Sequence, residues 1–144
     1  MLEHQALIAA RPATIWALLA PARWCAWDPD LKSVEQKAGA EALSEGFKVG
    51  MTMHSGVHFV AHFSKVVENQ HYLMTSKFFG GFAGCVMEHV LEDQGEGKTK
   101  VTYRFTLNGP VGSMLQWVQH GRVADSVLKG FEQLKELAEK EEAK

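Results

Sequence analysis

The spacing of apolar and polar residues divides the chain into a short mixed opening, a long alternating middle and a helical end. Residues 5–10 form an apolar run typical of a strand. Pro12 then suits the first turn of a helix, which we expect to end before Pro21. A second short helix is expected over residues 22–26, just before the turn signal at residues 28–30.

The middle of the chain alternates as strands do and is rich in Val, Phe, Tyr and Thr. The predicted strands cover residues 31–38, 47–55, 57–68, 71–79, 82–93 and 98–108. The turns between them are short and rich in Gly, so each strand must run antiparallel to the next, since a parallel crossover needs a dozen or more residues. The sequence therefore predicts an antiparallel meander with one covered face.

After Asn108-Gly109-Pro110 the spacing becomes helical and predicts one long helix over residues 111–140. Its apolar stripe recurs every three or four residues and must lie against an apolar surface. The stripe consists of Val123, Val127, Phe131, Leu134 and Ala138. Its bulky members lie in the second half of the helix, whereas Gly121 and Ala124 lie in the first, so we expect tight packing at one end and space at the other. Residues 139–144 are expected to be a solvated, fraying end.

Length and composition indicate a single α+β domain over residues 1–144. Hydrophobic residues make up 46% of the chain, enough for a sizeable core. The net charge of −2 argues against nucleic-acid binding. No apolar run reaches the roughly 20 residues of a membrane span, and no basic segment precedes the first apolar run, so we expect a cytoplasmic protein. Cys25 and Cys85 are expected to be reduced, buried thiols.

The predicted strands are long, and a broad twisted sheet of that length must curl around the helix to be covered. A cavity between the sheet and the helix follows as a hypothesis, lined by Met and aromatic side chains. The competing interpretation is a solid core, because such side chains fill space as readily as they line it. The predicted ligand-binding residues are Met51, Met53, Phe59, Ala61, Phe63, Met87, His89, Leu91, Tyr103, Phe105, Trp117 and Gly121. Trp24 and Trp27 are expected to be core residues near the cavity mouth.

His89 is the main candidate for chemistry. It shares strand parity with Cys85, Met87 and Leu91 and should therefore point inward, where it could act with Tyr103 as a general acid or base. The alternative is a hydrogen-bonded histidine of the cavity wall. No nucleophile is indicated, because no motif for covalent catalysis is present.

A metal site is not predicted, nor is any cofactor. His54, His58 and His62 recur every four residues, but on strands this spacing separates neighbours by about 13 Å. One ion cannot span that distance.

The inward face of residues 71–79 has two interpretations. The apolar residues Tyr72, Met74 and Phe78 favour one face, and the pattern of the family described next favours Leu73. A bulge would accommodate both.

In order, the motifs resemble the START-like helix-grip superfamily, which includes polyketide cyclases/dehydrases and lipid-transport domains. The residues that carry the resemblance are Ile8-x-Ala10-x-Pro12-x-x-Ile15-Trp16, Trp24-x-x-Trp27-x-Pro29, Gly46-x-x-x-Gly50, Gly97-x-Thr99-x-Val101-x-Tyr103-Arg104, Gly109-Pro110-x-Gly112 and Leu134-Lys135-x-Leu137-Ala138-Glu139. The resemblance implies two short helices after the first strand and a seven-stranded curved antiparallel sheet wrapped around a C-terminal helix. It also implies a deep pocket for lipids, polyketides, sterols or aromatic compounds, but no single reaction.

Three functional hypotheses follow. The first is a protein that binds a hydrophobic small molecule without catalysis. The second is an enzyme of the cyclase or dehydratase type that uses His89 and Tyr103 on a bound substrate. The third is an interaction module with a filled pocket, whose sheet edge or terminal helix contacts a partner such as a second copy of the chain.

Overall fold

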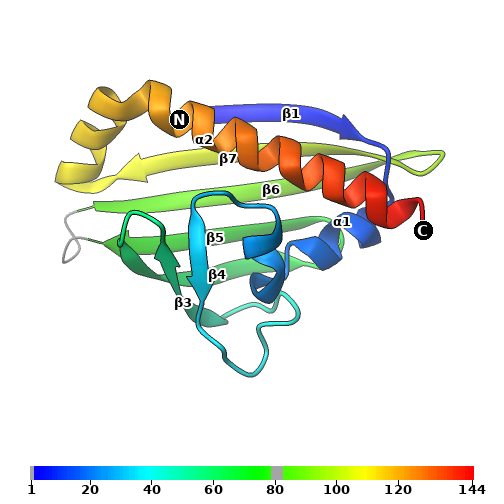
Figure 1. Ribbon diagram of the computed structural model, residues 1–144, viewed down its shortest axis with the longest axis horizontal. Coiled ribbons are helices and arrows are strands. Elements are labelled where there is room, and N and C mark those ends of the chain that lie inside the picture. The colour runs from blue at the N-terminus through cyan, green and yellow to red at the C-terminus, as the bar shows by residue number, and fades with distance from the viewer. Residues whose placement is uncertain (1, 79–82) are drawn as a thin grey trace.

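The computed structural model describes residues 2–78 and 83–144, with the backbone alone for residue 78 and residues 110–124. Two short helices follow the first strand, six further strands come next, and a long helix ends the chain, as predicted (Figure 1). The elements are β1 (Leu2–Ile8), α1 (Pro12–Leu18), the 3-10 helix η1 (Pro21–Ala26), β2 (Leu31–Val34), β3 (Lys48–Met53), β4 (His58–Val67), β5 (His71–Phe78), β6 (Ala83–Gly95), β7 (Lys98–Asn108) and α2 (Gly109–Glu142).

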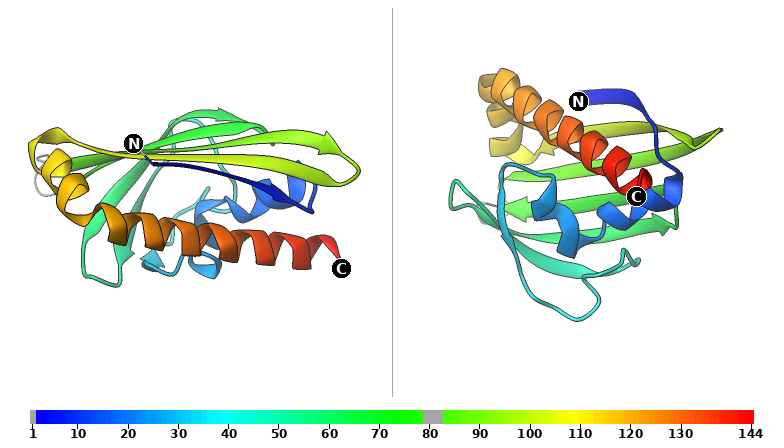
Figure 2. Two further views of the ribbon diagram at one scale, coloured as in Figure 1. Left: turned by 90° about the horizontal axis from the view of Figure 1, so that it is seen from above. Right: turned by 45° about the vertical axis from the view of Figure 1, so that its right-hand side comes forward.

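The seven strands form one antiparallel sheet in the order β1-β7-β6-β5-β4-β3-β2. The last six strands follow one another as a meander, and β1 completes the sheet beside β7. Figure 2 shows the sheet arching over α2, with α1 and η1 on the same side as the long helix. The predicted α+β helix-grip architecture is confirmed.

Several predicted boundaries differ from those of the structure. β1 covers residues 2–8 rather than 5–10, because it pairs along its length with residues 99–105 of β7. β2 ends at Val34 rather than at residue 38, and its pairing with β3 is already irregular between Leu31 and Ser33. A short, irregularly paired strand at a sheet edge leaves little regular pattern in the sequence.

The inner face of the sheet follows the predicted parity on β6. Cys85, His89 and Leu91 are buried, whereas Glu92 is exposed on the opposite face. On β5, Tyr72 and Met74 are fully buried and Leu73 lies between them on the outer face, so the apolar residues and not the family pattern gave the correct orientation. Phe78 lies outside the described side chains.

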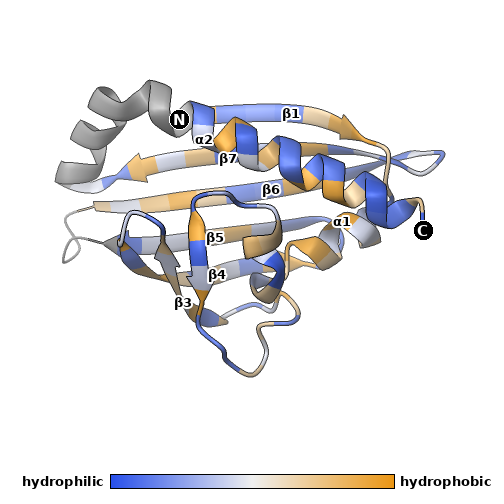
Figure 3. Ribbon diagram, viewed as in Figure 1, coloured by the Kyte–Doolittle hydropathy of each residue, from blue (hydrophilic) through white to orange (hydrophobic). Residues whose placement is uncertain are grey.

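A solid core occupies the end of the inner face that α1 and η1 cover. Ile15 and Leu18 of α1 are fully buried there, together with Leu134 of α2. The indole Nε1 of Trp24 donates a hydrogen bond to the carbonyl of Leu19 at 2.5 Å. This bond ties η1 to the end of α1, and Figure 3 shows the hydrophobic stretch of α1 against the sheet.

The C-terminal end of α2 is tied to the segment between β1 and α1. Glu139 Oε2 accepts a hydrogen bond from the backbone N–H of Ala9 at 2.9 Å. Glu142 pairs with Arg11 Nε at 2.7 Å and also accepts a hydrogen bond from the hydroxyl of Thr14. We refer to these five residues as the polar clasp. Contrary to the sequence prediction, residues 139–142 do not fray but continue the helix, held in place by these bonds.

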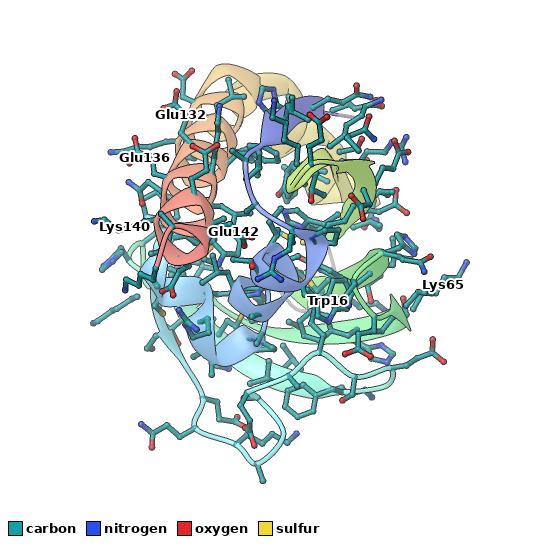
Figure 4. The ribbon with its side chains drawn as sticks, turned by 90° about the vertical axis from the view of Figure 1, so that its right-hand side faces the viewer. Trp16, Lys65, Glu132, Glu136, Lys140 and Glu142 are labelled. Carbon is teal, nitrogen blue, oxygen red and sulfur yellow. The ribbon has the colours of Figure 1, made fainter. Side chains whose placement is uncertain are left out.

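The outward face of α2 carries charged residues, as a helix with one buried stripe should. Glu132, Glu136 and Lys140 point away from the sheet, while Glu142 lies toward α1 (Figure 4). Within the described residues, no helix is both long and apolar enough to cross a membrane.

Candidate functional site

A cavity of about 580 Å³ lies between the inner face of the sheet and α2. Its wall is contributed by η1 and the turn after it, by strands β2 to β7, by the turn between β3 and β4 and by one stretch of α2, and most of it is apolar. The lining residues are Trp24, Trp27, Asp28, Asp30, Leu31, Met53, Ser55, Val57, Phe59, Met74, Ser76, Cys85, Met87, His89, Tyr103, Phe105, Leu107, Ser126, Val127, Gly130 and Phe131. The volume lies within the roughly 300–1,000 Å³ range of small-molecule pockets.

The residues predicted to bind a ligand divide into three groups. Those that line the cavity are Met53, Phe59, Met87, His89, Tyr103 and Phe105. Those that belong to the solid core instead are Met51, Ala61, Phe63 and Leu91. The last four lie on the inner face as expected, but in the part of the sheet that the short helices cover. Trp117 and Gly121 lie in the part of α2 of which the backbone alone is described.

Sequence reasoning missed part of the cavity wall. The parity rule that selected Met87 and His89 also applies to Cys85 on the same strand, so that signal was available. Val127 and Phe131 were placed in the stripe that fills the tight end of the helix, yet both line the cavity. Nothing in the spacing pointed to Asp28, since a turn residue has no face.

His89 is the most deeply buried polar group of the cavity wall, at 1% exposure. Its Nδ1 lies 2.7 Å from the hydroxyl oxygen of Tyr72, and the two rings stack with centroids 5.2 Å apart. The Tyr103 ring meets it edge-on at 4.7 Å. Burial lowers the pKa of His89 to about 3, so the imidazole is neutral at physiological pH.

The hydrogen bond to Tyr72 determines which nitrogen of His89 carries the proton. The Tyr72 hydroxyl has a second neighbour, the thioether sulfur of Met87 at 3.8 Å. Because an imidazole nitrogen is a much better acceptor than a thioether, we assign the Tyr72 proton to the bond with Nδ1. The neutral ring then carries its own proton on Nε2, where it is a hydrogen-bond donor.

Tyr103 lies beside His89 on the neighbouring strand β7, in direct register with it. It is 5% exposed, and its hydroxyl makes no hydrogen bond with the residues that the structure describes. Burial, together with the nearby Cys85 and Asp28, raises the pKa of Tyr103 well above its usual value. The phenol therefore stays protonated and can both donate and accept a hydrogen bond in the cavity.

Asp28 brings a carboxylate to the same cavity from the turn after η1. Its Oδ1 accepts a hydrogen bond from the backbone N–H of Asp30 at 3.0 Å. Burial raises the pKa of Asp28; the bond from Asp30 N–H opposes that rise, and the charge of Asp30 adds to it. The cavity thus combines an apolar wall with two half-buried acidic residues, Asp28 and Asp30.

The two cysteines occupy different environments. Cys85 is buried in the cavity wall with its sulfur 2.9 Å from the hydroxyl oxygen of Ser76, and burial raises its thiol pKa. A thiol that resists ionisation is a poor nucleophile. Cys25 is exposed, which corrects the prediction that both thiols are buried. It lies on η1, a 3-10 helix of two turns that buries Pro21 and Trp24 and leaves Cys25 on its outer side.

The histidines spaced four apart do not converge. His54 lies in the turn after β3, and His58 hydrogen-bonds through Nδ1 to the Thr52 hydroxyl at 3.1 Å. Among the residues that the structure describes, no three His, Cys, Asp or Glu side chains form a group suited to a metal ion.

An antiparallel sheet that grips one long helix over an apolar cavity defines the helix-grip class of proteins. The chain belongs to the polyketide cyclase / dehydrase and lipid transport family, whose family model matches residues 2–139. No curated protein matches the sequence.

Three solved structures illustrate the similarity in fold. A hypothetical protein from Helicobacter pylori has a TM-score of 0.81 at 7% identity, over 94% of this chain and 86% of that one. A protein from Mesorhizobium loti has a TM-score of 0.74 at 17% identity, over 96% of both chains. DynU16, a protein in the dynemicin biosynthetic locus, has a TM-score of 0.70 at 17% identity over 98% of this chain and 48% of that one.

Proposed function

We propose that the protein binds an apolar small molecule in the cavity between the sheet and α2. The observation that carries this proposal is the cavity itself, about 580 Å³ with a largely apolar wall and a few polar groups. Water gains few hydrogen bonds against such a wall, so an apolar ligand that displaces it is favoured. Membership of a family described by lipid transport as well as by polyketide chemistry supports the same proposal.

The state of His89 favours binding over acid–base catalysis. A general base works best when its pKa lies near the operating pH, whereas burial places the pKa of His89 at about 3. An imidazole of that pKa is a weak base, and its protonated form is scarce at pH 7. The role that suits it is a neutral hydrogen-bond donor that orients a ligand, as in the alternative to catalysis considered from the sequence.

The test is a titration with Nile red, a neutral dye that fluoresces in apolar surroundings. We expect saturable, one-to-one uptake by the unmodified protein. Met87→Trp should weaken uptake at least tenfold, because Met87 lines the cavity and the larger side chain fills it. Val86→Trp is the matched control, since Val86 is the preceding residue of β6 and faces the other side of the sheet.

Two results would contradict the proposal: an unmodified protein that takes up no dye, or equal losses in the two variants. Absence of dye uptake together with a stable dimer in light scattering would support the interaction module instead.

A further inference from the structure

We propose that the cavity selects ligands that carry a protonated amine, with Asp28 as the counter-charge. This inference rests on the proposed binding function and adds a charge preference to it.

The part of the cavity wall that the structure describes carries charged side chains of one sign only. Asp28 and Asp30 both line it, and no Lys or Arg is found among the lining residues that the structure describes. The neutral His89 adds no positive charge to balance them. A ligand with a carboxylate or phosphate group would therefore enter against a negative potential that the low-dielectric wall screens poorly.

Asp28 lacks an ionic partner. Within the described residues, no Lys, Arg or His nitrogen lies within 4.0 Å of its carboxylate. A carboxylate that has lost part of its hydration is costly unless it is paired with a cation or protonated. An ammonium group on a bound ligand would supply the missing charge.

Tyr103 is an independent indication that a polar group of the ligand belongs at this place. Its side chain is more than nine-tenths buried and lines the cavity, yet its hydroxyl has no partner among the described residues. An ammonium has three N–H donors. The Asp28 carboxylate and the Tyr103 oxygen are both acceptors, and both residues line the same cavity.

Aromatic rings complete the environment that an organic cation prefers. Trp27, Tyr103 and Phe131 all line the same cavity, and the negative faces of such rings attract ammonium groups. A ligand with an apolar body and a single amine would place the body against the Met and Phe residues and its charge beside Asp28.

The experiment compares three probes of one shape: 2-(1-naphthyl)ethylamine, 2-(1-naphthyl)ethanol and 1-naphthylacetate. Their affinities are measured by calorimetry at pH 7. We expect the amine to bind at least tenfold more tightly than the alcohol, and the carboxylate to bind most weakly. Asp28→Asn should remove the advantage of the amine while the alcohol binds as before. Glu136→Gln is the matched control, because it removes the same charge from the outer side of α2 (Figure 4).

The outcomes separate the two proposals. If the alcohol binds and the amine has no advantage over it, the charge preference is wrong and the apolar binding site stands. Carboxylate binding as tight as that of the amine also overturns the preference. If none of the three probes binds, the binding function and the inference fail together. The ranking of the three probes on the unmodified protein requires no variant, so the test does not depend on the folding of Asp28→Asn.

Discussion

The two ends of the inner sheet face are built from the same kinds of residues on the same strands, yet one is solid and the other is hollow. On β4, Phe63 is fully buried in the core, while Phe59, four residues earlier on the same face, lines the cavity. On β3, Met51 is in the core and Met53 is in the cavity wall. Residue type on the strand therefore does not decide whether a position packs or lines a pocket.

The difference comes from what covers the sheet. At the solid end, η1 inserts Trp24 against Phe63, with ring centroids 5.9 Å apart, and α2 adds Leu134. At the hollow end, the wall on the α2 side includes Gly130 and Ser126, which contribute little or no side-chain volume. Small residues on the covering helix leave space that large residues on the sheet do not reach.

The largest expected effect of breaking this contrast comes from truncating the two phenylalanines. Phe63→Ala should destabilise the fold by about 4 kcal/mol, since it removes a fully packed aromatic side chain and leaves a cavity in the core. Phe59→Ala should cost much less, because part of that ring already faces empty space. Urea denaturation of both variants measures the difference. Equal losses of stability would mean that the two ends are packed alike.

A smaller loss of stability is expected at low pH. It arises from His89, which lies where the solid and hollow ends meet. Its pKa is about 3 when folded and 6.5 ordinarily, so between these values the unfolded chain binds a proton that the folded chain does not. Stability is therefore lost as the pH falls through this window, by about 1.4 kcal/mol for each pH unit.

The measurement for His89 is the unfolding free energy at pH 7 and at pH 4.5, in the unmodified protein and in His89→Gln. The variant lacks the titrating group, so the difference in unfolding free energy between the two proteins should change by about 2–3 kcal/mol over this interval. Parallel pH profiles would show that the imidazole is not held neutral by burial.

The smallest effect on stability is expected from filling the hollow end from the side of α2. Gly130→Ala should stabilise the fold by up to about 1 kcal/mol, because alanine favours a helix more than glycine does. There is room for it, since the nearest atom to the new Cβ would be Pro29 Cδ at 3.5 Å. Gly84→Ala is the contrasting control, as its Cβ would lie 2.6 Å from Asn108 Oδ1 and 3.0 Å from the Ser76 carbonyl.

For Gly130→Ala, thermal unfolding reports the stability and Nile red titration reports the cavity. We expect a higher melting temperature. We also expect the affinity for the dye to fall a few-fold, because the added methyl group narrows the cavity. Gly84→Ala should instead lower the melting temperature, because its Cβ has no room. If Gly130→Ala lost stability and Gly84→Ala did not, this description of the two glycines would be contradicted.

Most of the fold could be predicted from the sequence, because strand alternation and helix spacing are local signals. The inward orientation of His89 follows from its parity with Cys85 and Leu91, and the antiparallel order follows from short turns. The ends of β1 and β2 could not be placed, because edge strands depend on pairing with partners distant in sequence.

The site was less predictable for a physical reason. Parity identifies the inner face, but the choice between Phe59 and Phe63, or between Met53 and Met51, depends on which helix lies above each residue. That is a tertiary relation without a period in the sequence. Asp28 was invisible for a different reason: the pattern treats it only as part of a turn, and its partial burial arises from the surrounding fold.

The polar clasp determines where a fluorophore or a surface anchor can be added without disturbing the fold. Because Glu139 and Glu142 of α2 bind Ala9, Arg11 and Thr14, the last turn of the chain is part of the framework and is poorly suited to carry an anchor or a fluorophore. Among the residues that the structure describes, no hydrogen bond or ion pair links the exposed hairpin turn at residues 95–97 to α2. A reporter of ligand binding is therefore better inserted at that turn than fused after Lys144.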